Sequence, residues 1–226
     1  MISLKNIKLT FRTLYSNYNN LSKIIFSRGK DEIKETTVLN NICLDIKSSE
    51  KVALVGHNGS GKTTLLKVIA GIYYPSSGDI DIEGKTKTII DVQMGMRDEF
   101  SGLENIYSIL YENGYSKKFI DEKVSWVIDF SELKDDIHKQ VRTYSSGMKL
   151  RLSSSIALLH QPDNLLLDEF FFTADEKFSE KCFDFFNKNF RNKILIISTH
   201  NPEVVKKVCN RKITLKNGKI ISDEKI

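Results

Sequence analysis

The sequence predicts an α/β fold in which an α/β core is interrupted by a mostly helical insert. Strand-like and helix-like hydrophobic patterns alternate through residues 1–93 and return from residue 161 onward. Between residues 94 and 160, by contrast, three successive apolar patterns have helical spacing. No internal repeat and no proline- or glycine-rich linker divides the 226 residues, so we expect a single domain over 1–226.

The elements of the core are expected from the period of their apolar residues. Ile2–Phe11 and Ile42–Ile46 alternate with a period near two, whereas Val52–Val55 is a continuous apolar run typical of a buried strand. A helical pattern follows at once and stops at Gly71. Further strands are expected near residues 79–82, 87–92, 165–167 and 194–197 and twice at the end of the chain, with helices near 103–110, 119–128, 152–159 and 180–190 and after Pro202.

The segment Thr13–Thr37 fits neither pattern. It is polar and rich in asparagine, so we expect a surface loop there. Its one candidate for a short amphipathic helix is Leu21–Phe26.

Composition limits the class of protein. Apolar residues make up 40% and charged residues 28%, which is ordinary for a globular chain and excludes a disordered or fibrous one. No apolar run approaches the roughly 20 residues that cross a bilayer, and the N-terminus lacks the apolar core of a signal peptide. We therefore expect a soluble cytoplasmic protein. The three cysteines, Cys43, Cys182 and Cys209, form no metal-binding motif and are expected to be reduced.

The formal net charge of +5 leaves two explanations open. It indicates either an anionic partner, such as nucleic acid or a membrane face, or a lysine-rich surface in contact with solvent. No aromatic residues interleave with the charges of the basic C-terminal segment from Val205 onward, so we favour the solvated surface.

A glycine-rich segment after the strand Val52–Val55 carries the first chemical signal. Its residues are Gly56, His57, Asn58, Gly59, Ser60, Gly61, Lys62 and Thr63, followed by Thr64, and they match the phosphate-loop pattern G-x-x-x-x-G-K-[ST]. Glycines let backbone N–H groups surround phosphate oxygens, and the following helix N-terminus adds a favourable dipole. Lys62 can reach the β- and γ-phosphates, and the Thr63 hydroxyl can bind Mg²⁺. His57 occupies a variable position and is expected to be incidental.

Two acids follow the apolar segment Asn164–Leu167. Asp168 and Glu169 would stand at the carboxyl end of a strand, where ligands bind in open α/β sheets. Asp168 would hold Mg²⁺, directly or through water. Glu169 could accept a proton from an attacking water, a catalytic role that is worth typically about 10²- to 10⁴-fold in rate.

A second anion site is predicted at Tyr144–Lys149, immediately before a helical pattern. The small residues Ser145, Ser146 and Gly147 would stand at the helix N-terminus, where backbone N–H groups bind anions. Because the chain already has a phosphate loop, the second site suggests that the nucleotide of another subunit is its target.

These three motifs together resemble the ABC (ATP-binding cassette) ATPases, whose signature is usually written L-S-G-G-Q. Ser145 and Gly147 match that signature, whereas Tyr144, Ser146 and Met148 depart from it. The variant Tyr-Ser-Ser-Gly-Met, followed by a basic residue, resembles the branch that exports capsule, O-antigen and teichoic acid polysaccharides.

The resemblance extends from Val38 to Ile221 and implies a fold. That fold is a P-loop NTPase (RecA-like) core with an antiparallel β subdomain and an inserted α-helical subdomain of the ABC type. The core would comprise about residues 1–93 and 161–226, and the insert about 94–160.

The resemblance also implies roles for further residues. His200, at a strand end, would be the switch histidine that contacts the γ-phosphate and acts in catalysis with Lys62 and Glu169. Asp175 would belong to the D-loop. Gln93 would be the Mg²⁺-sensing residue of the glutamine loop, although its surroundings match the family poorly. The residues expected to stack on adenine are Phe11 or Tyr15.

Membership of this family would make the chain an ATP-hydrolysing subunit that powers export of a lipid-linked cell-surface polysaccharide, with ATP and Mg²⁺ as cofactors. Two copies would hold two ATP molecules, each between the phosphate loop of one copy and Ser145–Gly147 of the other. The dimer would act on an integral membrane permease at the cytoplasmic face of the inner membrane, and no nucleic acid partner is expected. The end at Ile226 suggests that the chain lacks the carbohydrate-binding extension of some members.

Two alternative functions stay open. The ATPase could power a transporter for another cargo, such as a drug, lipid or nutrient, although the signature variant favours polysaccharide. It could also be a nucleic-acid-associated ABC ATPase, which only the +5 charge supports. A simple nucleotide kinase would leave the second anion site unexplained.

Overall fold

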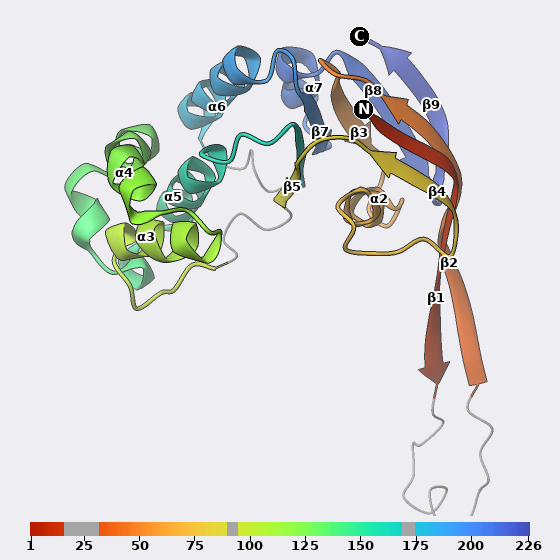
Figure 1. Ribbon diagram of the computed structural model, residues 1–226, viewed down its shortest axis with the longest axis horizontal. Coiled ribbons are helices and arrows are strands. Elements are labelled where there is room, and N and C mark those ends of the chain that lie inside the picture. The colour runs from red at the N-terminus through yellow and green to blue at the C-terminus, as the bar shows by residue number, and fades with distance from the viewer. Residues whose placement is uncertain (16–31, 90–94, 169–174) are drawn as a thin grey trace, which may run out of the picture.

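The computed structural model describes residues 1–15, 32–89, 95–168 and 175–226. Figure 1 shows an arch with a large sheet in its middle. One end of the arch holds α3 (Gly102–Glu112), α4 (Lys117–Ser131) and α5 (Ser146–Leu158), and a hairpin of β1 (Ile2–Tyr15) and β2 (Glu32–Ile46) projects at the other end. The helix expected at Leu21–Phe26 and the candidate residues Gln93 and Glu169 lie outside the described residues.

A six-stranded, mostly parallel sheet forms the middle of the arch. Its strands, in spatial order, are β5 (Thr86–Ile89), β6 (Asn164–Leu167), β7 (Ile194–Ser198), β3 (Lys51–Val55), β8 (Arg211–Lys216) and β9 (Lys219–Lys225). The first five are parallel, and β9 is antiparallel to β8. Leu54 pairs with Ser198, and Leu167 pairs with Ile197. The carboxyl ends of β3, β7 and β6 therefore lie at one edge of the sheet, and the predicted α/β fold is confirmed.

One face of this sheet packs on α2 (Lys62–Ile69), which also contacts a second, antiparallel sheet of order β2-β1-β4, where β4 is Ser77–Ile82. Apolar side chains of both sheets and α2 form one core. Its members include Ile2, Leu4, Ile42, Val52, Leu65, Leu66, Ile196 and Ile213. This arrangement sandwiches the helix that follows β3 between two sheets and so fixes its position.

The segment Thr13–Thr37 is not a loop at either of its ends, contrary to the expectation from its composition. β1 continues to Tyr15, and β2 begins at Glu32. Arg12 pairs with Glu35 across the two strands and forms an ion pair of 2.8 Å with it. Cross-strand charge pairs and β-branched threonines support a strand without an apolar face. Apolar periodicity therefore does not detect this part of the hairpin.

The inserted helices begin at serine residues. Ser101 and Glu104 form a capping box at the start of α3, in which each side chain accepts the backbone N–H of the other. Ser116 and Ser145 cap α4 and α5 through their side-chain oxygens. The apolar faces of the three helices pack together and against two short 3₁₀ helices, η1 (Lys134–His138) and η2 (Val141–Thr143).

The other face of the parallel sheet is covered by α5, α6 (Glu176–Asn189) and α7 (Pro202–Val208). Trp126 of α4 stacks on Phe130 with ring centroids 4.8 Å apart, and its centroid lies 5.8 Å from that of Phe185 in α6. Aromatic rings thus join the helical insert to the core. Over the ranges that the structure describes, no helix is both long enough and apolar enough to cross a bilayer.

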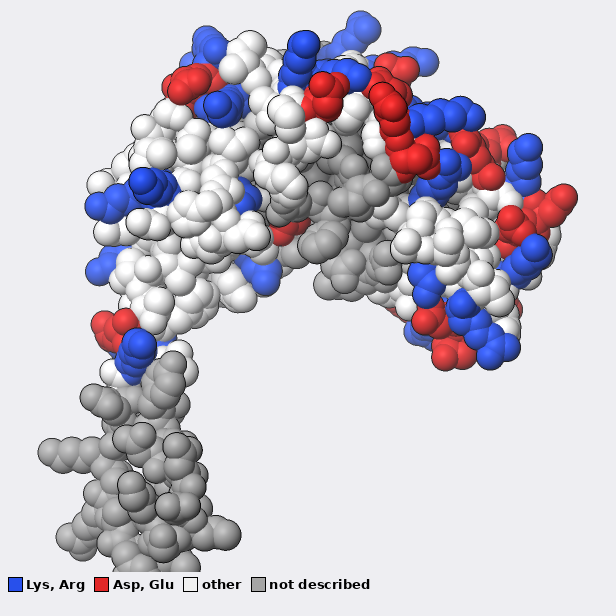
Figure 2. Space-filling view, turned by 180° about the vertical axis from the view of Figure 1, so that it is seen from behind, with Lys and Arg blue, Asp and Glu red and all other residues white. Residues whose placement is uncertain are grey.

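Charged side chains of both signs are mixed on the face of the molecule that Figure 2 shows. Figure 2, a view from behind, shows acidic and basic residues side by side along the convex side of the arch and over its helical end. Arg211, in the basic C-terminal segment, is itself paired with Glu50 at 2.8 Å and with Asp223 at 2.6 Å. This distribution favours a solvated surface over a continuous basic surface for nucleic acid.

The turn between β8 and β9 reaches the segment that precedes α2. Asn217 and Gly218 have φ of 48° and 72°, the left-handed conformation typical of an Asn-Gly hairpin turn. Gly218 N–H donates to Ser60 O over 2.9 Å, and Gly218 O accepts from Asn40 N–H over 2.8 Å. A Cβ atom on Gly218 would lie 2.1 Å from Val38 O, so glycine alone fits this contact.

His160 is a buried titratable residue between α5 and β6. It is 8% exposed, and its Nδ1 lies 2.8 Å from Tyr115 Oη. Burial, together with the smaller effect of the nearby Lys87 ammonium, lowers the pKa of His160 to about 4. The imidazole is therefore neutral in the folded chain at pH 7.

We expect Gly218→Ala to lower the free energy of unfolding by roughly 2 kcal/mol or more, because the methyl group would overlap Val38 O and disfavour the positive φ. Gly114→Ala is the matched control, since Gly114 has φ of 82° and nothing within 4 Å of its Cβ position. The control should lose only about 1 kcal/mol. Urea unfolding followed by circular dichroism measures both variants, and equal losses would contradict a role for the Val38 contact.

We expect the stability of the protein to fall between pH 7 and pH 5 through His160. The pKa of His160 is lowered from 6.5 to about 4 on folding, so the unfolded chain binds the proton more tightly and stability is lost as pH falls below about 6.5. The loss should be about 2 kcal/mol at pH 5. His160→Gln should remove this share of the pH dependence, as measured by urea midpoints at the two pH values. The same pH dependence in both proteins would contradict it.

Candidate functional site

The glycine-rich segment between β3 and α2 forms the first part of the site. A Cβ atom on Gly56 would lie 2.3 Å from Leu215 O, and Gly61, with φ of 106°, is the N-cap of α2. No side chain in the described ranges caps α2, and its first turn holds no acid. The N–H groups of that turn therefore keep their capacity to bind an anion, as expected of a phosphate loop.

Lys62 places its charge over this loop. It is 7% exposed, and its Nζ donates to Gly56 O over 2.7 Å and to His57 O over 3.3 Å. Burial lowers the pKa of Lys62, and the carboxylate of Asp168 offsets only part of this shift. An anion at the loop would stabilise this half-desolvated ammonium more than neutral carbonyls do.

Thr63 and Asp168 join the loop to the end of β6. Thr63 Oγ1 donates to Asp168 Oδ2 over 2.8 Å, although 105 positions separate them in sequence. Hydroxyl and carboxylate oxygens are ligands that Mg²⁺ prefers. Ser60 Oγ, in the same loop, is buried and has no hydrogen-bond partner among the residues that the structure describes. The donor set and the unsatisfied hydroxyl fit a Mg²⁺–phosphate group.

The other loop residues contribute less. His57 and Asn58 are exposed, and His57 Nδ1 lies 2.8 Å from Asn58 O, within the loop itself. Thr64 is half-buried in α2, and Gly59 has open space around its Cβ position. These contacts are in keeping with an incidental role for His57.

The sheet brings three predicted site segments to one edge. β3 leads into the phosphate loop, β6 into Asp168, and β7 through Thr199 into His200. Because β7 lies between β3 and β6, the exposed His200 follows the strand between the other two segments. Glu169 and Gln93 lie outside the described residues, so their catalytic and Mg²⁺-sensing roles stay predictions.

Ser145, Ser146 and Gly147 lie on the helical insert, at the start of α5. Ser145 Oγ accepts from Met148 N–H over 3.2 Å, and Ser145 and Ser146 are exposed. Ser145 and Gly147 line a cavity of about 300 Å³. Its other lining residues are Glu132, Leu133, Asp136, Met148, Arg151 and Asp175. This geometry leaves the predicted anion site open to a second molecule.

The aromatic candidates for adenine stacking are only partly described. Phe11 is 38% exposed and packs edge-on against Tyr73, with ring centroids 5.4 Å apart. The side chain of Tyr15 is not among those described. The choice between Phe11 and Tyr15 therefore stays a prediction.

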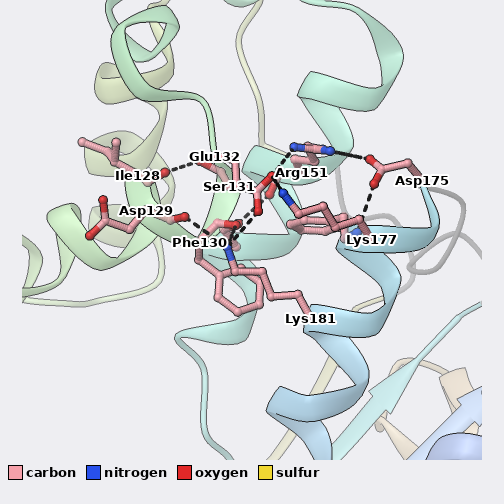
Figure 3. Close-up of polar contacts among 11 residues, drawn as sticks. Ile128, Asp129, Phe130, Ser131, Glu132, Arg151, Asp175, Lys177 and Lys181 are labelled. Atoms are coloured by element: carbon pink, nitrogen blue, oxygen red, sulfur yellow. Dashed lines mark hydrogen bonds and ion pairs between the residues drawn. The ribbon is translucent and has the colours of Figure 1, made fainter.

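Two features of the site escape a sequence analysis that follows hydrophobic periods. The Asn217–Gly218 turn donates to Ser60 O and so supports the phosphate loop; the Asn-Gly pair between two strand patterns is a signal that could have found it. Arg151 binds Glu132 and Asp175, at the ends of α4 and α6 (Figure 3). No local pattern indicates that contact, because helix packing brings its members together.

Comparisons with known proteins agree with this geometry. Residues 39–171, more than half of the chain, match the family model described as ABC transporter. The chain is 40% identical over 202 residues to the O-antigen export system ATP-binding protein RfbE of Yersinia enterocolitica, covering 87% of this chain and 82% of that one. It is 32% identical over 223 residues to the teichoic acids export ATP-binding protein TagH of Listeria monocytogenes, covering 96% of this chain but 66% of the relative.

The fold is also that of solved ATP-binding cassettes. A dimeric post-hydrolysis state of the cassette MJ0796, bound to ADP and Pi, superposes with a TM-score of 0.78 at 22% identity and covers 100% of this chain and 98% of that one. A second dimeric structure of the same cassette gives a TM-score of 0.77 at 23% identity, over the same shares of the two chains. The resemblance expected from the three motifs is confirmed by the family match and by the two export relatives: this chain belongs to the ABC transporter family.

Proposed function

We propose that this chain is the ATP-binding and ATP-hydrolysing subunit of an ABC exporter that transports a lipid-linked cell-surface polysaccharide across the cytoplasmic membrane. The observation that carries the ATPase is the hydrogen bond of 2.8 Å between Thr63 and Asp168, beside Lys62 on the phosphate loop. The observation that favours the cargo is the name of the relatives, which export O-antigen or teichoic acids. The variant signature at Tyr144–Met148 favours the same branch.

The chain's own groups bind the triphosphate. Backbone N–H groups at the start of α2 surround the β- and γ-phosphates, and Lys62 exchanges its carbonyl contacts for phosphate oxygens. Thr63 and Asp168 would hold Mg²⁺, and the ion, when bound, neutralises charge on the phosphate oxygens. Asp168 is ready for this role because the Thr63 hydroxyl already orients its carboxylate.

Hydrolysis requires a base near the γ-phosphate, and we assign that role to Glu169. Glu169 accepts a proton from water as the water oxygen bonds to the γ-phosphorus and the bond to the bridging oxygen breaks, which yields ADP and phosphate. Glu169 directly follows Asp168 in the sequence. His200, which follows the strand between the phosphate loop and Asp168, would contact the γ-phosphate.

The site requires a second copy of the chain. Ser145–Gly147 lie on the insert with exposed serines, so in a homodimer they would meet the nucleotide on the partner's phosphate loop. Closure of the dimer on ATP and opening after hydrolysis would then move an integral membrane permease. The dimer would act at the cytoplasmic face of the membrane. The similar solved cassettes are themselves dimeric.

A transporter for another cargo is the second candidate. The same ATP site would serve it unchanged, because the cargo does not touch the residues described above. A nucleic-acid-associated role has less support, since the charges in Figure 2 are mixed in sign.

We expect Glu169→Gln to bind ATP and dimerise in its presence but to hydrolyse ATP about 100-fold or more slowly, because the amide cannot accept the proton. Lys62→Ala is the matched comparison, since it should lose ATP binding itself. Phosphate release, light scattering and nucleotide-binding fluorescence measure the three properties. Wild-type turnover in Glu169→Gln would contradict the role of Glu169.

The cargo is tested in the cell. Deletion of the coding gene should remove a surface polysaccharide while its lipid-linked precursor accumulates inside, because synthesis continues without export. The wild-type gene should restore the surface polymer, and the gene for Glu169→Gln should not. Unchanged surface glycans in the deletion strain would contradict polysaccharide export and favour another cargo.

A further inference from the structure

The end of α4 and the start of α6 meet at one arginine of α5 (Figure 3). Arg151 of α5 donates through Nη1 to Glu132 Oε2 over 3.0 Å. It donates to Asp175 Oδ2 through Nε over 3.1 Å and through Nη2 over 2.5 Å. Glu132 is the C-cap of α4 and Asp175 the N-cap of α6. We call Glu132, Arg151 and Asp175 the arginine cluster.

Both carboxylates of the arginine cluster are held in place by other contacts. Glu132 has φ of 60°, an uncommon conformation for a residue other than glycine, and Lys181 lies 3.4 Å from its carboxylate. Asp175 Oδ1 accepts from Phe178 N–H over 3.0 Å and so caps α6. Arg151 also lies over the Phe178 ring, 5.5 Å from its centroid. The guanidinium therefore meets two fixed acceptors.

The cluster is charged at neutral pH. The hydrogen bond from Arg151 is the main reason that the pKa of Asp175 lies below its ordinary value. Burial would raise the pKa of Glu132, but the hydrogen bond from Lys181 and the nearby cations lower it overall. The side chains of Arg151 and Glu132 are only 23% and 27% exposed. Partial burial and a planar, forked donor make such a contact more specific than an exposed ion pair.

The cluster borders the signature. Ser145 and Gly147 line the same cavity of about 300 Å³ as all three cluster members. Asp175, the third member of the cluster, lies seven positions after Asp168 in the sequence. Arg151 thus connects the helix that begins at the signature with the helix that follows the Mg²⁺-binding carboxylate.

We propose that Arg151 is a positioning residue that couples the signature residues Ser145–Gly147 to the start of α6. The coupling makes the signature end of α5 and the start of α6 move as one unit. In a dimer, Ser145–Gly147 would serve one ATP and Asp168 the other, so Arg151 links the two sites through a single chain. This role in turnover rests on the proposed function, whereas the coupling itself does not.

Lys181 already joins α6 to α4, so the contribution of Arg151 is to hold α5 against these two helices. Lys181 Nζ donates to Phe130 O over 2.9 Å and to Asp129 O over 3.1 Å, so α4 and α6 stay connected without the arginine. Among the described residues, Arg151 makes the ion pairs that join α5 to Glu132 and Asp175, whereas Lys177 and Lys181 reach Glu132 from α6. Loss of Arg151 should therefore release the signature helix in particular.

The coupling is tested on the full chain without nucleotide, by hydrogen–deuterium exchange. Arg151→Met should raise exchange about threefold or more at residues 146–150 and also at 176–180. Asp175→Asn keeps the cap of α6, because asparagine caps as well as aspartate, but weakens the ion pair. It should raise exchange at 146–150 as well.

Lys177→Met is the control, since Lys177 lies 3.8 Å from Glu132 and is 80% exposed, and it should change neither segment. Unchanged exchange at 146–150 in Asp175→Asn would overturn the coupling.

The effect on turnover is tested with the same variants. Arg151→Met should lower kcat about tenfold while the Kd for a fluorescent ATP analogue stays within about twofold, because the phosphate loop is untouched. Arg151→Lys should restore part of kcat, since lysine keeps the charge but not the fork. A loss of ATP affinity equal to the loss of kcat, or no rescue by lysine, would overturn the positioning role. Absence of ATPase activity in the wild-type protein would instead contradict the proposed function and leave the exchange result to decide the coupling.

Discussion

The parallel pairing of β3, β7 and β6 is the constraint on which the site depends. Leu54 pairs with Ser198, and Ile197 pairs with Leu167, so the three strands end at one level. A shift of one residue along β6 would move Asp168 by about 3.3 Å and turn its side chain to the other face of the sheet. The contact between Thr63 and Asp168 would then be lost. Asn164, at the start of β6, opposes such a shift, because its side-chain amide donates to Glu83 O over 2.8 Å and to Thr86 Oγ1 over 3.1 Å.

The phosphate loop is supported from several sides at once. The Asn217–Gly218 turn contacts Ser60, Gly56 lies against Leu215, and α2 is enclosed by two sheets. This enclosure leaves few conformations for the loop, so little entropy remains to be lost when an anion binds. The signature residues have a different support. They stand at the exposed start of α5, a helix whose later residues are buried in apolar cores and which Arg151 joins to α4 and α6. We therefore expect substitutions at the phosphate loop to change ATP binding, and substitutions beside the signature to change turnover.

Much of the fold follows from local patterns. The strand before the phosphate loop, the acids after β6 and the serine-capped start of α5 can each be predicted from a few adjacent residues. Patterns fail where stability comes from pairs that are distant in sequence. The Arg12–Glu35 pair extends the β1–β2 hairpin beyond its apolar residues, and Arg151 meets Glu132 and Asp175 only after three helices have packed. Glu169 and Gln93 rest on the family resemblance and stay predictions.

The position of Trp126 gives the molecule a built-in optical reporter. It is the only tryptophan of the chain, and it stacks on Phe130 in the insert while its ring centroid lies 5.8 Å from that of Phe185 in the core. Separation of α4 from α6 would open this aromatic contact to water and shift the emission of the indole to longer wavelength. Intrinsic fluorescence therefore reports, in the unmodified protein and without a label, whether the insert and α6 stay in contact during turnover.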